Sequence, residues 1–301
     1  MEVTLRGLVQ IESTPAFHAK TRSVRLSLWQ IAVLTGLFLW LYGPILVRLA
    51  TQWRRDPNFS HGFFVPLFSM FVVWHDRARL TRIAPSPSWA GLLLLSFAML
   101  VLIVGQMGAE LFLARFSLLL ALAGSIVLFL GWNFFRAALF PWAFLILMIP
   151  IPAILYNQIT FPLQLFTSKV ATVVLASLGV PVLREGNIIT LPSMTLEVAQ
   201  ACSGIRSLMS LITLAVIYGF IVERRLWARC VLVVASVPIA IIANSVRIIG
   251  TGLLVQYWNA DAAEGYFHSS WGWLLFVISL LMLYAVHRRI RILRRETGTL
   301  S

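Results

Sequence analysis

Charged residues are scarce in this 301-residue chain, making up 12% of it, about half the ~25% found in soluble domains. Two cysteines are too few for a disulfide scaffold. There is no Gly-rich phosphate loop and no Cys/His metal-ligand spacing, so nothing points to nucleotide or zinc chemistry. Hydrophobic residues, at 59%, exclude both an intrinsically disordered chain and a water-soluble one. The composition predicts an all-α polytopic membrane protein with small loops and no large soluble domain.

Acidic residues are also few, which leaves a formal net charge of +13. Such a charge could indicate a nucleic-acid partner. In a membrane protein, however, basic residues collect in cytoplasmic loops. We therefore expect contact with membrane lipid, no nucleic-acid partner, and neither a cofactor nor a metal.

Apolar runs of spanning length predict about eight transmembrane helices. The first follows Lys20, Arg22 and Arg25, as a signal peptide would, but it is long for a signal sequence and is interpreted as a retained anchor. The second is short and contains Pro66, so a tilted, broken or re-entrant segment is expected. The predicted spans are 28–47, 62–75, 89–107, 111–131, 137–155, 205–222, 229–256 and 271–287.

Segment 158–178 is apolar enough to span but contains Lys169. If it does not cross, sixteen basic residues fall on the cytoplasmic side and six outside, which agrees with the positive-inside rule. We therefore predict an outer-face interfacial helix here. The six outer residues are Arg48, Arg54, Arg55, Lys169, Arg184 and Arg206, and the two that remain within the membrane are Arg115 and Arg247.

A small β-hairpin is predicted next, on the outer face. Arg184–Leu191 and Thr195–Val198 are β-prone runs separated by Pro192-Ser193, and Glu185-Gly186-Asn187 is turn-like. The chain is read as one integral-membrane domain, 1–301. Its parts are a cytoplasmic tail (1–27), spans one to five (28–157), the interfacial helix and hairpin (158–201), spans six to eight (202–287) and a basic cytoplasmic tail (288–301).

Three polar residues at or inside the later spans are candidates for chemistry. Cys202 lies at the outer start of the sixth span, where helix amides favour a thiolate. Arg247 lies deep in the seventh span, where a guanidinium usually faces a partner or a cavity. His268 lies at the outer end of the last span. Taken singly, each has an ordinary structural interpretation: a small buried residue, a snorkelling arginine and a solvated histidine.

The predicted topology brings these three residues to the same leaflet. A thiol, an imidazole and a guanidinium are the parts of a cysteine nucleophile site, in which histidine moves the protons and arginine stabilises the thiolate or oxyanion. Asn244 precedes Arg247 by three residues, on the same helical face, and could orient it. Cys230, at the cytoplasmic end of its span, is interpreted as inert.

Sequence motifs around these residues resemble those of the exosortase/archaeosortase family, with the bacterial exosortases most similar. Ala201–Leu208 (ACSGIRSL) is similar to its cysteine motif, Asn244–Ile248 (NSVRI) to its arginine motif, and His268 with Trp271-Gly272 to its histidine motif. Phe59–Phe63 (FSHGF) resembles a further family feature. The resemblance covers nearly the whole chain, in order.

The resemblance implies a membrane-embedded cysteine protease or transpeptidase of the bacterial inner membrane, with its active site facing the periplasm. Cys202 would be the nucleophile, Arg247 the electrostatic partner and His268 the general acid/base. The implied partners are exported proteins whose C-terminal sorting signal, of the PEP-CTERM type, has a Pro-Glu-Pro motif, a hydrophobic helix and an Arg-rich tail. Bacterial members commonly accompany exopolysaccharide production.

Four points stay open. The motif's glutamate could be read by Arg184, by Arg206 or by the Arg54-Arg55 pair, and His61 is a second candidate base. The acyl-enzyme could be resolved by water or by an amine. The alternative functions are a transporter, in which Arg115 and Arg247 line a pathway, and a non-catalytic component of a polysaccharide-export complex.

Overall fold

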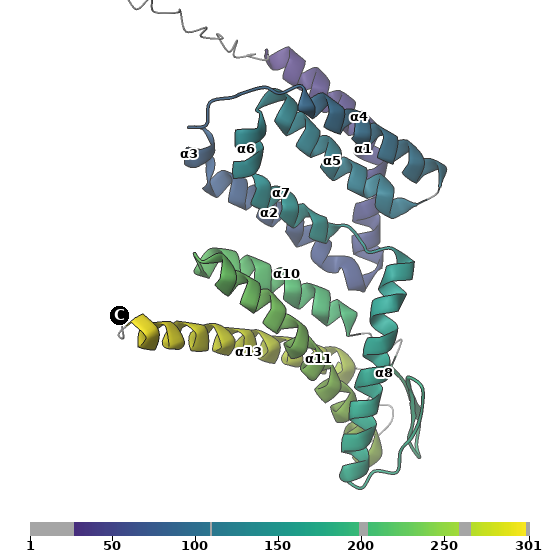
Figure 1. Cartoon of the computed structure of the whole chain (residues 1–301). Helices are drawn as coiled ribbons and strands as arrows, with labels where there is room; N and C mark the ends of the chain where they lie inside the picture. Colours follow the sequence, from purple (N-terminus) through teal and green to yellow (C-terminus); the bar gives the residue numbers. More distant parts are fainter. Residues whose placement is uncertain (1–26, 109, 199–203, 259–265, 299–301) are drawn as a thin grey trace, which may run out of the picture.

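The computed structural model describes residues 27–108, 110–198, 204–258 and 266–298. Helices form most of this part of the chain, together with one small sheet, as expected for an all-α polytopic membrane protein (Figure 1). Large apolar side chains such as Trp40, Leu93 and Val234 are mostly exposed. An apolar exterior of this kind is suited to contact with lipid chains rather than water.

The first part of the chain forms a bundle around Tyr42, Leu49 and Leu119, which are fully buried. Close packing within the α4–α5 hairpin is possible because Gly91, Gly105 and Gly124 let the two backbones approach. The elements are α1 (Leu28–Arg55), η1 (Pro57–Phe63), α2 (Phe64–His75), α3 (Arg77–Leu80), α4 (Ala90–Met107), α5 (Leu111–Phe129), α6 (Trp132–Ala137), α7 (Leu139–Phe144) and η2 (Leu145–Met148).

The second part consists of α8 (Ala153–Ser177), a sheet and three long helices. The helices are α10 (Ile205–Val222), α11 (Leu226–Tyr257) and α13 (Tyr266–Gly298). Leu211, Leu232 and Leu283, one from each, meet in a common core. α13 continues as a helix through the basic segment that the sequence assigned to a tail.

Seven helices in the described residues are long and apolar enough to cross a membrane, where about eight were expected. The predicted span 62–75 contains only the 12-residue α2, about 18 Å long and so shorter than a bilayer core. The predicted span 137–155 is interrupted, because Pro150 and Pro152 hold the chain extended before α8 begins. The seven are α1, α4, α5, α8, α10, α11 and the Gly272–Leu293 part of α13.

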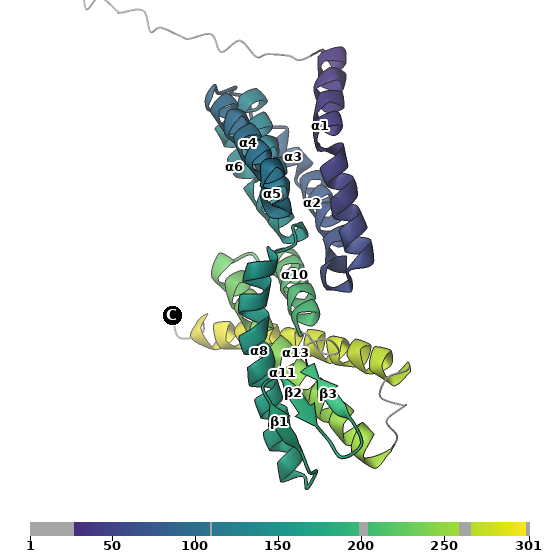
Figure 2. The same ribbon diagram turned by 90° about the vertical axis from the view of Figure 1, so that its right-hand side faces the viewer.

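Segment 158–178, predicted to be interfacial, lies within α8, which is itself long and apolar enough to span. Its orientation is unusual, since both views show α8 running crosswise to α13 rather than alongside it (Figures 1 and 2). Lys169 is exposed, while Thr167 and Ser168 are buried. The interfacial position of this helix stays a prediction.

The sheet has three antiparallel strands in the order β1-β2-β3, one more than the predicted hairpin. The strands are β1 (Leu183–Glu185), β2 (Ile188–Thr190) and β3 (Thr195–Glu197). The extra strand arises because Gly186, at φ 65°, allows a two-residue turn inside the first β-prone run. Ile189 is fully buried and packs with Ala171 of α8 and Ile248 of α11. The sheet is thereby fixed against the helix that contains Arg247.

Candidate active site

The three motif-bearing helices α10, α11 and α13 pack against one another (Figures 1 and 2). The cysteine motif lies at the start of α10 and the histidine motif at the start of α13, whereas the arginine motif lies in the second half of α11. α11 runs antiparallel to the helix before it and to the helix after it. All three motifs therefore fall at one end of the group.

Gly204, in the cysteine motif, contacts the arginine motif directly. It adopts a left-handed conformation at φ 55° and caps the start of α10. A Cβ atom on Gly204 would stand 2.9 Å from Nδ2 and 3.1 Å from Cγ of Asn244. Both residues are buried. Only glycine meets both requirements at this position, because other L-residues are strained at positive φ and would collide with the Asn244 amide.

Arg247 lies close to the histidine motif, although less tightly than Asn244 lies to Gly204. Its guanidinium Cζ lies 3.6 Å, and Nη2 3.7 Å, from the position that a Cβ would take on Gly272. The planar guanidinium thus lies close to the backbone of α13 at Gly272, at a distance that still leaves room for a methyl group. The arginine motif is therefore in contact with the cysteine motif through Asn244 and with the histidine motif through Arg247.

The sheet leads the chain towards this site. Val198, which follows β3, is buried, and its amide donates a hydrogen bond of 3.0 Å to the carbonyl oxygen of Asn187. Val198 packs with Ile248, the residue next to Arg247. The sheet thus places Val198, the last described residue before the cysteine motif, beside the arginine motif.

Of the three predicted catalytic residues, the structure describes the side chain of Arg247 alone. Cys202 lies outside the described residues, two positions before Gly204. For His268 the structure describes the backbone, in the first turn of α13 and four residues before Gly272. Arg247 is described fully and is half-buried. Its place between the two other motifs agrees with the predicted convergence, while the roles of the three side chains stay predictions.

Cys230 is free and exposed, in the second turn of α11. It precedes Arg247 by seventeen residues on one helix, a separation of about 25 Å at 1.5 Å per residue. Cys230 is thus far from the Arg247 guanidinium.

The four arginines proposed to read an acidic motif are all exposed. Arg184 is engaged within its own hairpin, where Nη1 donates a 2.8 Å hydrogen bond to the carbonyl oxygen of Gly186. Arg206 lies in the first turn of α10, beside Gly204, and Arg54 and Arg55 end α1. Of these four arginines, Arg206 is the one that lies within the cysteine motif.

His61, the second candidate base, is buried in η1, and η1 packs against α10. Burial lowers the pKa of His61 from its ordinary value of 6.5, and backbone hydrogen bonds at Leu147 and Asn58 act in the opposite sense without cancelling this effect. The next residue, Gly62, packs against the indole ring of Trp53. These contacts suit a neutral histidine with a role in packing.

The structure adds Gly204 and Gly272 to the site. The sequence contained a signal for both, since Gly204 follows Cys202 by two positions and Gly272 follows His268 by four. Their contact with Asn244 and Arg247 depends on how the helices cross.

Among the described residues there is no group of three or more His, Cys, Asp or Glu side chains that could hold a metal ion.

Comparison with family models gives a match to the transmembrane exosortases over residues 53–285. The chain belongs to the transmembrane exosortase family. No curated protein and no solved structure matches it. The matched region begins in the last turn of α1 and ends within α13, so it includes all three motifs. As an exosortase, the chain is a membrane-embedded sorting enzyme that acts on proteins with sorting tails.

Proposed function

We propose that this exosortase is a cysteine protease or transpeptidase that cleaves the C-terminal sorting signal of exported proteins. The observation that supports this is the contact of the arginine motif with both other motifs, through Gly204–Asn244 and Arg247–Gly272. Because Cys202 precedes Gly204 by two residues, covalent connectivity keeps their Cα atoms within about 7 Å of each other. The candidate nucleophile is thus tied to the Asn244–Arg247 segment.

In the proposed reaction the Cys202 thiolate attacks the scissile carbonyl carbon and forms a tetrahedral oxyanion. Arg247 stabilises the thiolate before attack or the oxyanion after it. The C–N bond then breaks, and His268 delivers a proton to the leaving amine. The result is a thioester between Cys202 and the new C-terminus of the substrate, which water or an amine resolves.

The substrate we propose has a Pro-Glu-Pro motif, a hydrophobic helix and an Arg-rich tail, and its processing accompanies exopolysaccharide production. A hydrophobic helix with arginines at its cytoplasmic end would lie beside these spans in the orientation set by the positive-inside rule. Its acidic motif would then emerge at the end where Gly204, Asn244 and Arg247 meet. Arg206, exposed in the first turn of α10, is the arginine best placed to bind the glutamate.

The test is co-expression with a substrate that carries such a tail, followed by mass spectrometry of its new C-terminus. We expect Cys202→Ala to abolish cleavage and Cys230→Ala to leave it intact, since Cys230 lies about 25 Å along α11 from Arg247. A free carboxylate would indicate hydrolysis, and an added mass would indicate transfer. Normal processing by Cys202→Ala would exclude cysteine catalysis and favour a transport or scaffold function.

We also propose that the site faces the periplasm at the inner membrane. Glu185 in β1 and Arg225 before α11 are both exposed, and the charge asymmetry assigns them to opposite faces. In a protein lacking both native cysteines, an impermeant thiol reagent should label Glu185→Cys in intact spheroplasts. Arg225→Cys should react only after lysis. The reverse pattern would invert the topology.

A further inference from the structure

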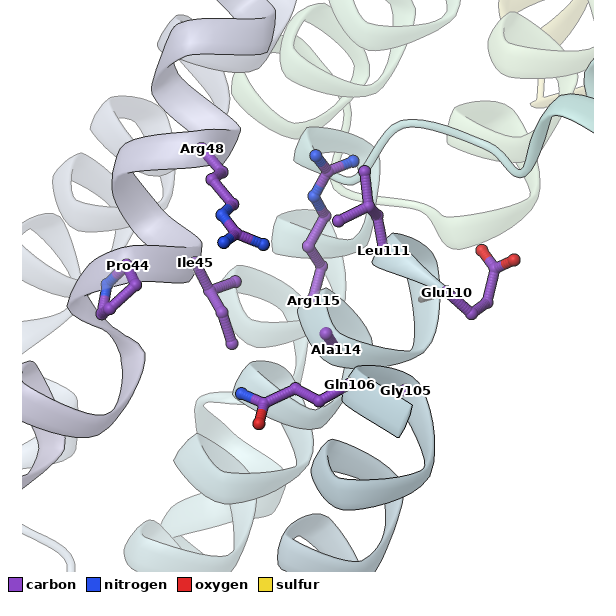
Figure 3. Close-up of a pocket in the computed structure, with 9 residues that line it drawn as sticks. All are labelled: Pro44, Ile45, Arg48, Gly105, Gln106, Glu110, Leu111, Ala114 and Arg115. Carbon is purple, nitrogen blue, oxygen red and sulfur yellow. The ribbon is translucent and has the colours of Figure 1, made fainter. Parts of the chain in front are cut away.

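A cavity of about 370 Å³ lies between α1 and the α4–α5 hairpin, at the end where α1 leads into η1 (Figure 3). Arg48 reaches into it from α1, and Arg115 and Gln106 line it from α5 and α4. The carboxylate of Glu110 points away from both guanidinium groups in Figure 3. Glu110 caps α5 instead, with Oε1 accepting a 3.2 Å hydrogen bond from the Phe112 amide. Glu110 still acts electrostatically on Arg115, but two arginines against one carboxylate leave the cavity lining with a net positive charge.

Arg115 is the unusual member of this group, because only 4% of it is exposed. Its one hydrogen bond to a described side chain runs from Nη2 to Oε1 of Gln52, at 2.6 Å. A guanidinium has five N–H donors, and a buried charge is costly unless it is paired and hydrogen-bonded. Arg115 also lines a second polar cavity, of about 460 Å³, which extends towards the start of α8. Arg115 is therefore a buried cation that borders two cavities.

An apolar groove of about 510 Å³ lies along the preceding turns of α1, where its last lining residue, Tyr42, comes one helical turn before Ile45 of the cavity. Most of the α1 residues that line the groove and the cavity recur every three or four positions and so share one face of the helix, whereas Leu37 and Leu39 lie outside this spacing. Met99, Ala121 and Ser125 line the opposite wall. On the α1 side the groove is lined by Ile31, Leu34, Thr35, Leu37, Phe38, Leu39, Leu41 and Tyr42, and the cavity by Pro44, Ile45 and Arg48.

We propose that the cavity and groove together bind one anionic phospholipid. The phosphate lies between Arg48 and Arg115, which can donate bidentate, charge-assisted hydrogen bonds to it. One acyl chain lies in the groove. Half of a ~30 Å hydrocarbon core corresponds to about ten helical residues. Arg48 and Phe38 are separated by this length of α1, and Phe38 lines the groove.

The shape of the site favours a lipid over a soluble anion. A soluble anion would need the two arginines but not an apolar groove along the neighbouring turns of α1. An anionic lipid uses both features, and its phosphate neutralises the buried charge on Arg115. η1 contacts both α1 and α10, so the bound lipid would brace the α1 bundle near the helix that begins with the cysteine motif.

The test combines native mass spectrometry with thermal unfolding of the purified full-length chain in detergent. Phosphatidylglycerol should raise Tm by roughly 5 °C at saturating lipid, and phosphatidylcholine should raise it less. Arg115→Gln and Arg48→Gln should lose at least half of this shift and lose the lipid adduct. Arg54→Gln is the matched control, because Arg54 is exposed at the same end of α1 but lines neither cavity. Arg48 is exposed, so its variant should fold even if Arg115→Gln does not.

Two further arms identify the occupant. Thr35→Trp should fill the groove and reduce the phosphatidylglycerol shift, while an equal shift with inorganic phosphate alone would show a free-anion site and overturn the lipid proposal. If Arg48→Gln and Arg54→Gln lose the phosphatidylglycerol shift in Tm equally, the shift reflects general surface charge. That result would also overturn the lipid proposal. Displacement of the lipid adduct by a soluble acidic peptide would assign the site to a protein partner.

Discussion

Arg247 and Gly272 lie in contact across α11 and α13, with Cζ of the guanidinium 3.6 Å from the position of a Cβ on Gly272. This distance is ordinary van der Waals separation, so one methyl group fits and a larger side chain does not. The pair fixes the arginine motif against the start of α13, one helical turn after His268. If Arg247 acts in catalysis, its position should respond to the size of residue 272.

Substitution of Gly272 should therefore have an effect that depends on size. Gly272→Ala should process substrate normally and be neutral or slightly stabilising, since alanine favours a helix over glycine by up to ~1 kcal/mol. Gly272→Leu should displace the guanidinium and lower the processing rate about tenfold or more, a loss of ~1.4 kcal/mol in transition-state stabilisation. Gly36→Leu is the control, because Gly36 of α1 has open space around its Cβ position. Equal activity in Gly272→Leu and Gly36→Leu would contradict a catalytic role for the contact.

The charge and shape of Arg247 give the second prediction. If the guanidinium stabilises the Cys202 thiolate, Arg247→Ala should alkylate more slowly near neutral pH. Arg247→Lys should be impaired less, since it keeps the charge but loses the planar fork. The measurement is the rate of Cys202 alkylation against pH in detergent, in a Cys230→Ala background. An unchanged profile in Arg247→Ala would move its role to the oxyanion or to substrate binding.

Gly204 gives the third prediction, because its backbone and its neighbour both exclude a side chain. Gly204→Ala should incur the strain of positive φ, about 1–2 kcal/mol, and in addition displace Asn244. Gly186→Ala is a matched control: Gly186 has a φ of 65° but open space around its Cβ position. Both variants should lower Tm, and Gly204→Ala should also lose processing. If the two behave alike, the contact with Asn244 has no functional importance.

The sequence predicted the membrane class and the site of the turn in the sheet, whereas the convergence of Cys202, Arg247 and His268 stays a prediction. These features follow from local properties, namely composition, apolar periodicity, glycine at a turn, and the alternating direction of successive spans. The charge of Arg247 inside an apolar run was visible for the same reason. Such signals need no knowledge of which helices touch.

What the sequence did not show depends on contacts between distant segments. The predicted span 137–155 ignored the helix-breaking effect of Pro150 and Pro152, which was readable in principle. The burial of Arg115 beside Gln52 was not, because sixty-three residues separate the two. Likewise, the sequence gave no reason to connect Glu223 with His287, sixty-four residues apart.

His61 gives a prediction for the pH dependence of stability. Burial lowers its pKa in the folded state below 6.5, so the unfolded chain binds the proton more readily. Its contribution to stability is therefore complete above about pH 6.5 and is lost as the pH falls below that value. The Tm of His61→Gln should fall less between pH 7.5 and about pH 5 than that of the wild type. His75 is exposed, so His75→Gln should keep the wild-type slope; equal slopes in all three proteins would remove His61 as the source.

A buried polar triad at the other end of the long helices gives the last prediction. Oε1 of Glu223 lies 3.0 Å from Nε2 of His287, and the hydroxyl oxygen of Tyr218 lies 2.6 Å from Nδ1. Glu223 and His287 are both at least 95% buried. An imidazole that donates from Nε2 and accepts at Nδ1 satisfies both neighbours, so this triad joins α13 to the end of α10.

Removing different parts of the triad should therefore have graded effects. Tyr218→Phe deletes one hydroxyl and should cost ~1 kcal/mol. His287→Ala leaves the Glu223 carboxylate without its buried imidazole partner and should cost ~3 kcal/mol or more. Glu223→Gln keeps an acceptor for Nε2–H, so its loss should lie between these two. Thermal unfolding in detergent measures the order, and a His287→Ala protein as stable as Tyr218→Phe would show that the pair does not hold the helices together.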